Sequence, residues 1–177
     1  MRFELLGWPE DGPVLQLDHR SFAYAGKFVR ETTGKVVART DDVVLGALSF
    51  NRDRATDCTW RVRTITVHRD HQGEGIGSRL LAAVADRLIQ DGDAVLIAVN
   101  NPIAYQAAYR GGFEFTGETS GMAELVCRYP ASCTSQSYGA GMARYASRED
   151  LPAEMRQFAR NRSKAPQPEP VTPPMLC

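Results

Sequence analysis

The clearest pattern of apolar and polar positions along the chain is helical and lies between residues 76 and 90. Apolar side chains recur there at spacings of three and four residues, at Ile76, Leu80, Leu81, Val84, Ala85, Leu88 and Ile89. This spacing places them on one face of an α-helix, and charged residues occupy the other face. Gly92 follows where a helix commonly ends. The pattern therefore predicts an amphipathic helix that begins near Ile76.

Short runs of apolar and β-branched residues on both sides of this helix predict strands. They cover residues 3–8, 35–39, 43–50, 59–67, 94–99, 113–115 and 122–129. The run 94–99 is apolar throughout, which is typical of a strand buried on both faces of a sheet. In the run 59–67 the alternation slips by one residue between Val62 and Ile65, as a β-bulge at Arg63–Thr64 would cause. Strands and helices in this order predict an α/β fold.

The same patterns divide the chain into four parts. They are an N-terminal strand and following segment (1–34), a core (35–130), a loop with a C-terminal helix (131–163) and a tail (164–177). The first part has poor apolar spacing and at most a short helix within 14–29. The proline-rich tail cannot bury a core, so we expect it to be disordered.

Two further helices are expected outside the amphipathic one. Pro102 suits the first turn of a helix that runs to Arg110, where two glycines follow. A helix over 148–162 would have Asp150 as its cap and Pro152 in its first turn.

Length and charge narrow the function classes. The 177 residues fit one domain, and 21 basic side chains balance 21 acidic ones. No overall field therefore favours nucleic acid or an anionic membrane as a partner. One group of arginines is interleaved with aspartates and is expected to be a solvated surface: Arg52, Arg54, Arg61 and Arg63. The chain has no secretion signal and no run near the roughly 20 apolar residues of a membrane span, so we expect a cytoplasmic protein.

Cysteine and histidine positions predict no metal site. The four cysteines form no Cys-x-x-Cys pair, and the chain has only three histidines. His68 and His71 are close in sequence, but they flank a strand end where exposed polar residues are ordinary. Separate reduced thiols fit a cytosolic protein.

A glycine-rich stretch between the strand 59–67 and the amphipathic helix carries the most specific chemistry. From Val67 to Leu81 it has the sequence V-H-R-D-H-Q-G-E-G-I-G-S-R-L-L. The first N–H groups of a helix lack internal partners, and together with the helix dipole they attract a phosphate. Glycines let a bulky pyrophosphate approach the backbone. The spacing Gln-x-x-Gly-x-Gly lacks the Lys-Ser/Thr of a P-loop and the third glycine of a dinucleotide fold.

This stretch resembles the core motif of the GCN5-related N-acetyltransferase (GNAT) superfamily, except that Arg69 replaces a proline. A second block, Asn101-Pro102-Ile103-Ala104 with Tyr109 and Gly112-Phe113, is also similar to that family. The blocks occur in the family's order, and the resemblance covers about residues 35–130. It implies a mixed sheet of six to seven strands, splayed at its centre, with helices on both faces. It also implies transfer of an acetyl group from acetyl-coenzyme A to a primary amine.

The resemblance implies roles for individual residues. The pyrophosphate would lie on the backbone amides of Gln72, Gly73, Glu74, Gly75, Ile76, Gly77 and Ser78. The pantetheine arm would run along the bulged strand beside Ile65 and Val67, in the gap that separates it from 94–99. The bulge would free one N–H for the thioester oxygen. Asn101 would contact the arm, although it suits a plain helix cap equally well.

The general acid departs from the family pattern. A tyrosine is usual five residues before the phenylalanine of Gly-Phe, and this chain has Ala108 there. Tyr109 lies one place later, about 100° around the helix, and is the expected acid. Tyr105 lies on the same face and is the fallback, and a core or surface role suits each tyrosine as well. No motif marks the general base, for which the candidates are Asp57, Glu118 and Glu124.

Together these expectations describe direct transfer to a small-molecule or peptide amine. No cysteine is placed for a covalent intermediate. The acceptor would contact residues 14–34, 51–58 and 117–121, which carry no motif, so its identity, the acyl chain length and the oligomeric state stay open. The alternative is a regulatory module that binds acyl-CoA without turnover. An acetyltransferase toxin acting on RNA would need a basic face that this neutral chain lacks.

Overall fold

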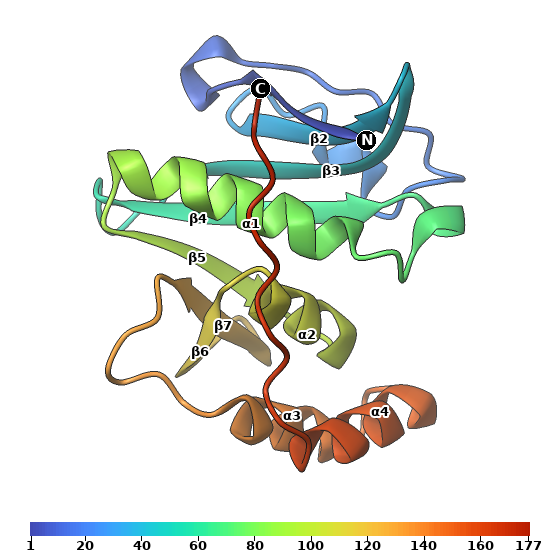
Figure 1. The fold of residues 1–177 in the computed structure, drawn as a ribbon, viewed down its shortest axis with the longest axis vertical. Helices are drawn as coiled ribbons and strands as arrows, with labels where there is room; N and C mark the ends of the chain where they lie inside the picture. Colours follow the sequence, from blue (N-terminus) through green and yellow to red (C-terminus); the bar gives the residue numbers. More distant parts are fainter.

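A mixed seven-stranded sheet forms the centre of the computed structural model, which describes residues 1–177 (Figure 1). The strands are β1 (Arg2–Gly7), β2 (Gly34–Thr40), β3 (Val43–Arg52), β4 (Thr59–Val67), β5 (Ala94–Val99), β6 (Glu114–Ser120) and β7 (Glu124–Tyr129). Their order is β1-β2-β3-β4-β5-β7-β6, and all neighbours are antiparallel except β4 and β5. The predicted mixed α/β sheet is confirmed.

Four α-helices accompany the sheet. They are α1 (Ile76–Leu88), α2 (Pro102–Arg110), α3 (Tyr138–Ala146) and α4 (Ala153–Ser163). The apolar stripe that predicted α1 packs against the sheet beside α2, and both helices lie in front of the strands in Figure 1. None of the four has the length and apolar composition of a membrane span.

The two faces of the sheet are covered differently. On the α1 face, Val36 and Ala38 of β2 join the main core, whereas Val37 belongs to a small cluster with Phe28 and Ala47 on the other face. Residues 9–33 follow Trp8, which packs into the main core, and their Leu15, Leu17 and Phe28 side chains cover that second face. They contain short 3-10 helices and no α-helix, whereas helices were expected on both faces. Their apolar residues lack helical spacing, so they bury side chains from an irregular chain instead.

The sheet opens between β4 and β5. Residues 59–62 pair with residues 94–97, and beyond Val62 the two strands separate. On its other side β4 stays paired with β3, where the register shifts so that Arg63 has no partner. The predicted bulge and the central splay are therefore both present. As a result, the edge of β4 from Arg63 to Val67 faces a gap.

Helix α3 begins within residues 131–141, which were expected to form a loop because they are rich in serine, threonine and glycine. Gly139 and Gly141 of this stretch lie within the helix. A Cβ on Gly139 would overlap the Ser163 carbonyl at the end of α4, and one on Gly141 would overlap the Tyr105 hydroxyl on α2. These glycines therefore permit close helix packing. Helix α4 was predicted to begin near residue 148 with Asp150 as its cap, but it begins at Ala153.

The tail 164–177 is ordered, which corrects the expectation of disorder. In Figure 1 it runs past α2 and α1 to the first strand, in red. The Val171 N–H donates to the Arg110 carbonyl at 2.7 Å, at the end of α2. An extended proline-rich chain keeps its remaining backbone groups free for such bonds.

The last two residues of the tail pair with β1. The Cys177 N–H donates to the Phe3 carbonyl at 3.0 Å, and the Leu5 N–H donates to the Cys177 carbonyl at 2.8 Å. Leu176 packs against the main core. These contacts cover the free edge of β1, and composition alone does not reveal them.

Candidate active site

The turn before α1 has a backbone conformation that glycine adopts most easily. Gly73 has φ of +86°, and Gly75, the N-cap of α1, has φ of +77°. A side chain is strained in this left-handed region. A Cβ at either position would meet no atom within 4 Å, so the space beside the turn is open. The turn therefore presents bare backbone to an approaching ligand.

The N–H groups at the start of α1 precede its first hydrogen bond. That bond runs from the Arg79 N–H to the Gly75 carbonyl at 3.1 Å, so the N–H groups of Ile76, Gly77 and Ser78 come before it. No side chain caps the helix. The Arg79 guanidinium donates to a carbonyl of the turn at 3.0 Å and adds positive charge there. Free N–H groups, a helix dipole and a guanidinium together suit a phosphate.

The same turn adjoins the free edge of β4. A Cβ on Gly77 would lie 3.6 Å from the Val67 side chain and 3.9 Å from that of Ile65. These are ordinary contact distances, so the first turn of α1 passes directly over the end of the strand. A continuous surface therefore leads from the glycine turn along β4 into the gap.

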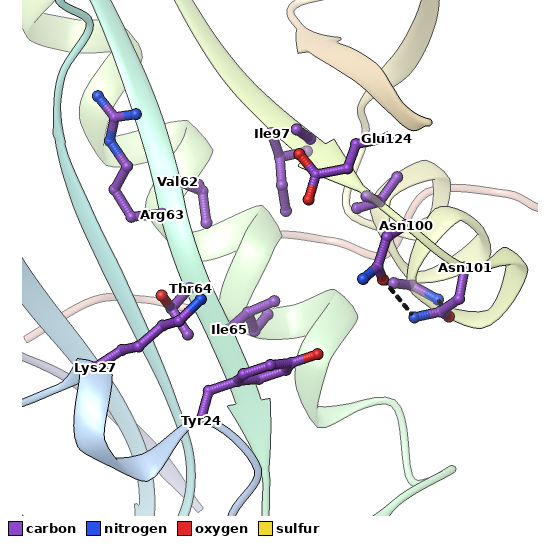
Figure 2. A pocket seen from close by; sticks show the side chains of 13 residues that line it. Tyr24, Lys27, Val62, Arg63, Thr64, Ile65, Ile97, Asn100, Asn101 and Glu124 are labelled. Atoms are coloured by element: carbon purple, nitrogen blue, oxygen red, sulfur yellow. Dashed lines mark hydrogen bonds between the residues drawn. The ribbon is translucent and has the colours of Figure 1, made fainter. Parts of the chain in front are cut away.

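A cavity of about 220 Å³ lies in that gap (Figure 2). Strands β4 and β5 supply apolar wall residues such as Ile65 and Val99. The polar wall residues come from segments far apart in the sequence: Tyr24, Lys27, Arg63, Thr64, Asn100, Asn101 and Glu124. An apolar surface with a few convergent polar groups is typical of a small-molecule site.

Glu124 contributes the only carboxylate among these wall residues. It begins β7, where pairing of Val99 with Leu125 places it beside the end of β5. Its carboxylate points into the gap from the β5 side (Figure 2). It takes part in none of the ion pairs of the structure, so it is free to accept a proton or bind a cation.

Arg148, which follows α3, holds this part of the wall in place. Its guanidinium donates to the Asn100 carbonyl at 3.1 Å and to the Ala123 carbonyl at 3.2 Å. Two more of its donors reach the Asp150 carboxylate at 3.0 and 2.6 Å, which fixes the guanidinium plane. One side chain therefore joins the end of β5 to the residue before Glu124.

Tyr24 enters the gap from the opposite wall (Figure 2). It is 56% exposed and has φ of +58°, an uncommon backbone conformation for a tyrosine. Its neighbours hold it there. The Arg69 N–H donates to the Ser21 carbonyl at 2.9 Å, and the Phe22 ring packs edge-on against His68 at 5.2 Å. Strain of this kind often occurs at functional positions.

The family model for "Acetyltransferase (GNAT) family" matches residues 3–113, which is more than half of the chain. The chain belongs to the GNAT family. Enzymes of this family are acetyltransferases that use acetyl-CoA. No curated protein sequence matches the chain.

Three solved structures of similar fold are GNAT or acetyltransferase proteins. One from Desulfovibrio desulfuricans is 24% identical with a TM-score of 0.44, and an N-acetyltransferase from Staphylococcus aureus is 18% identical with a TM-score of 0.46. One from Salmonella typhimurium, described as an acetyltransferase with its cofactor acetyl-CoA, is 18% identical with a TM-score of 0.45. The alignments cover 54%, 54% and 59% of this chain and 67%, 66% and 69% of those chains.

The tyrosine expected as the general acid of this GNAT chain does not reach the cavity. Tyr109 is fully buried, and its hydroxyl donates to the Gln136 carbonyl at 3.1 Å and accepts from the Phe115 N–H at 2.9 Å. Burial raises the pKa of this hydroxyl, which makes it a poorer proton donor. The expected role of Tyr109 is therefore corrected to a structural one.

Tyr105, the fallback, is buried as well. Its hydroxyl donates to the Tyr138 carbonyl at 3.2 Å, and burial raises its pKa. Both tyrosines are covered by α3 and the residues before it, which lie beyond the span that matches the family model. The sequence of α2 alone could not show this.

The other expected residues have definite places. Gln72 and Glu74 are exposed in the turn, whereas the side chains of Ile76 and Ser78 are buried. Asn101 caps α2, because its Oδ1 accepts from the Ala104 N–H at 2.8 Å, and it also lines the cavity.

Of the three candidate bases, only Glu124 is a wall residue of the cavity, and Asp57 and Glu118 are not. Tyr24, Lys27 and Arg148 were not identified from the sequence, because no motif surrounds them.

Proposed function

We propose that the enzyme transfers the acetyl group of acetyl-CoA directly to a primary amine in the cavity between β4 and β5. One observation carries the proposal. The phosphate-suited turn and the cavity lie at opposite ends of the same free strand edge, Arg63 to Val67. The coenzyme has the same layout, with a pyrophosphate at one end of an extended arm and a thioester at the other.

Acetyl-CoA fits the residues that are present. Its pyrophosphate would bind the N–H groups of Gly73 to Ser78, where glycines leave room that a Cβ would restrict. The unpaired edge of β4 would hydrogen-bond the amides of the arm as a neighbouring strand does, with Ile65 and Val67 beside it. When bound, the coenzyme supplies a thioester carbonyl to the cavity.

Three groups of the chain then serve the transfer. Glu124 accepts the proton that the attacking amine loses as its nitrogen bonds to the carbonyl carbon. The bulge at Arg63 interrupts the pairing with β3 and supplies a backbone N–H to the carbonyl oxygen as it gains charge. Tyr24 donates a proton to the sulfur as the carbon–sulfur bond breaks. No covalent intermediate with the enzyme is required.

Replacing Glu124 tests the proposal. Glu124→Gln should lower amine-dependent release of free thiol by roughly 10²–10⁴-fold, the usual contribution of a general base. The calorimetric affinity for acetyl-CoA should stay the same, because Glu124 lies away from the turn. Glu118→Gln is the matched control, since Glu118 is exposed on β6 and outside the cavity wall.

The burial of both α2 tyrosines favours one other reading, a module that binds acetyl-CoA without turnover. It predicts tight coenzyme binding and no thiol release with any amine. Thiol release that depends on both an amine and Glu124 would rule it out.

A further inference from the structure

The cavity wall carries opposite charges on its two sides. Lys27 lies on the β4 side and Glu124 lies on the β5 side, whereas the Arg63 guanidinium turns away from the gap toward β3 (Figure 2). Neither Lys27 nor Arg63 forms an ion pair. By contrast, the nearby Arg61 bonds to the Asp53 carboxylate at 2.9 Å.

The contacts that these two cations do make are with neutral groups. The Lys27 ammonium lies 5.0 Å from the centre of the Tyr24 ring. The Arg63 guanidinium donates to the Asn51 side-chain oxygen and, at 3.3 Å, to the Arg52 carbonyl. Partial burial and the charge of Arg61 lower the pKa of Arg63, and the nearby Asp53 carboxylate offsets only part of this effect.

We propose that the acceptor is an amine that also carries an anionic group, a carboxylate or a phosphate, which binds Lys27 while the amine faces Glu124. This inference rests on the proposed function. Coenzyme A does not supply the anion, because in the proposed mode its phosphates lie at the glycine turn and its arm is neutral. The wall has opposite charges on its two sides, which complements a zwitterion and orients its amine toward the base.

A series of amines of matched length tests this class. The anionic members are β-alanine, 4-aminobutyrate, 6-aminohexanoate and phosphoethanolamine. The neutral counterparts are amino alcohols of equal length, and diamines are the cationic counterparts. With free thiol as the readout, the best anionic amine should exceed its neutral counterpart in kcat/KM by about three- to fivefold, the effect expected of one partly exposed ion pair. The carboxylate and phosphate members distinguish the two anion sources.

A variant that reverses the charge of Lys27 provides a second test of the acceptor class. Lys27→Glu should abolish the preference for anionic amines and favour diamines, while the affinity for acetyl-CoA stays unchanged. Lys164→Glu is the matched control, because Lys164 is exposed beyond α4 and makes the same change in net charge. Equal kcat/KM for anionic and neutral amines, unchanged by Lys27→Glu, would overturn the inference alone. Absence of thiol release with every amine would overturn the proposed function and the inference with it.

Discussion

The two ends of the free edge of β4 are built in different ways. At the Val67 end, the groups proposed to contact the ligand are backbone N–H groups of one short stretch, from Gly73 to Ser78. At the Arg63 end, they are side chains from the N-terminal segment, β4, the end of β5 and β7. The first end depends on local chain geometry, whereas the second depends on how distant segments pack. The phosphate end can therefore be recognised from spacing alone, and the acceptor end cannot.

Removing the hydroxyl of Tyr24, and in a second variant that of Tyr109, should give the largest change in turnover and in stability. Tyr24→Phe should lower turnover by about 10²-fold, because the sulfur loses its proton donor. Its stability should change by less than about 0.5 kcal/mol, since the ring is exposed. The measurements are thiol release at saturating acetyl-CoA and urea unfolding.

Tyr109→Phe should behave in the opposite way. Its hydroxyl accepts from the Phe115 N–H, so its loss leaves a buried donor unpaired and costs about 1–3 kcal/mol of unfolding free energy. Turnover of the folded protein should stay within about twofold, because nothing near the sulfur has changed. A loss of turnover in Tyr109→Phe with normal activity in Tyr24→Phe would return the acid to α2.

A bulkier residue at Gly77 tests whether the glycine turn binds the pyrophosphate. Gly77 has room for a Cβ at ordinary contact distance from Val67, and Gly77→Val adds two further methyl groups between the start of α1 and the strand edge along which the ligand is proposed to lie. Affinity for acetyl-CoA should fall by more than about tenfold, as expected when a backbone anion site is blocked. Gly26→Ala is the control, because a Cβ there meets nothing within 4 Å. Unchanged calorimetric affinity in folded Gly77→Val would place the pyrophosphate elsewhere.

Much of the fold was predictable from local pattern. The helix 102–110 and the strand 94–99 have the predicted bounds, and the slip of alternation marks the bulge at Arg63. Helix α3 was not predictable, because Gly141 signals a loop in sequence although it permits contact with Tyr105.

The candidate site divides in the same way. Gln72 to Ser78 follow from one motif, because their backbone groups all belong to one short stretch of the chain. Tyr24 reaches the cavity only because backbone and ring contacts attach its segment to residues 68 and 69. Tyr109 is excluded because residues beyond 130 cover it. Neither fact has a local signal in sequence.

The smallest expected effect concerns Arg148, which positions the acceptor end without touching the reacting atoms. Arg148→Lys keeps the charge, but a lysine cannot match the planar fork that reaches Asp150 and the carbonyls of Asn100 and Ala123 together. Loss of about one hydrogen bond, roughly 0.7–1.4 kcal/mol, should raise the KM for the amine by about three- to tenfold.

The KM for acetyl-CoA and kcat should stay nearly constant in Arg148→Lys, because the turn and the proton-transfer groups keep their chemistry. Asp150→Asn is the companion variant, since it removes the ion pair but leaves the guanidinium able to reach both carbonyls. Its effect on the amine KM should be smaller than that of Arg148→Lys. A purely structural Arg148 would instead lower the melting temperature and leave the ratio of the two KM values unchanged. That result would separate the C-terminal segment from the acceptor site and leave Glu124 positioned by the β5–β7 pairing alone.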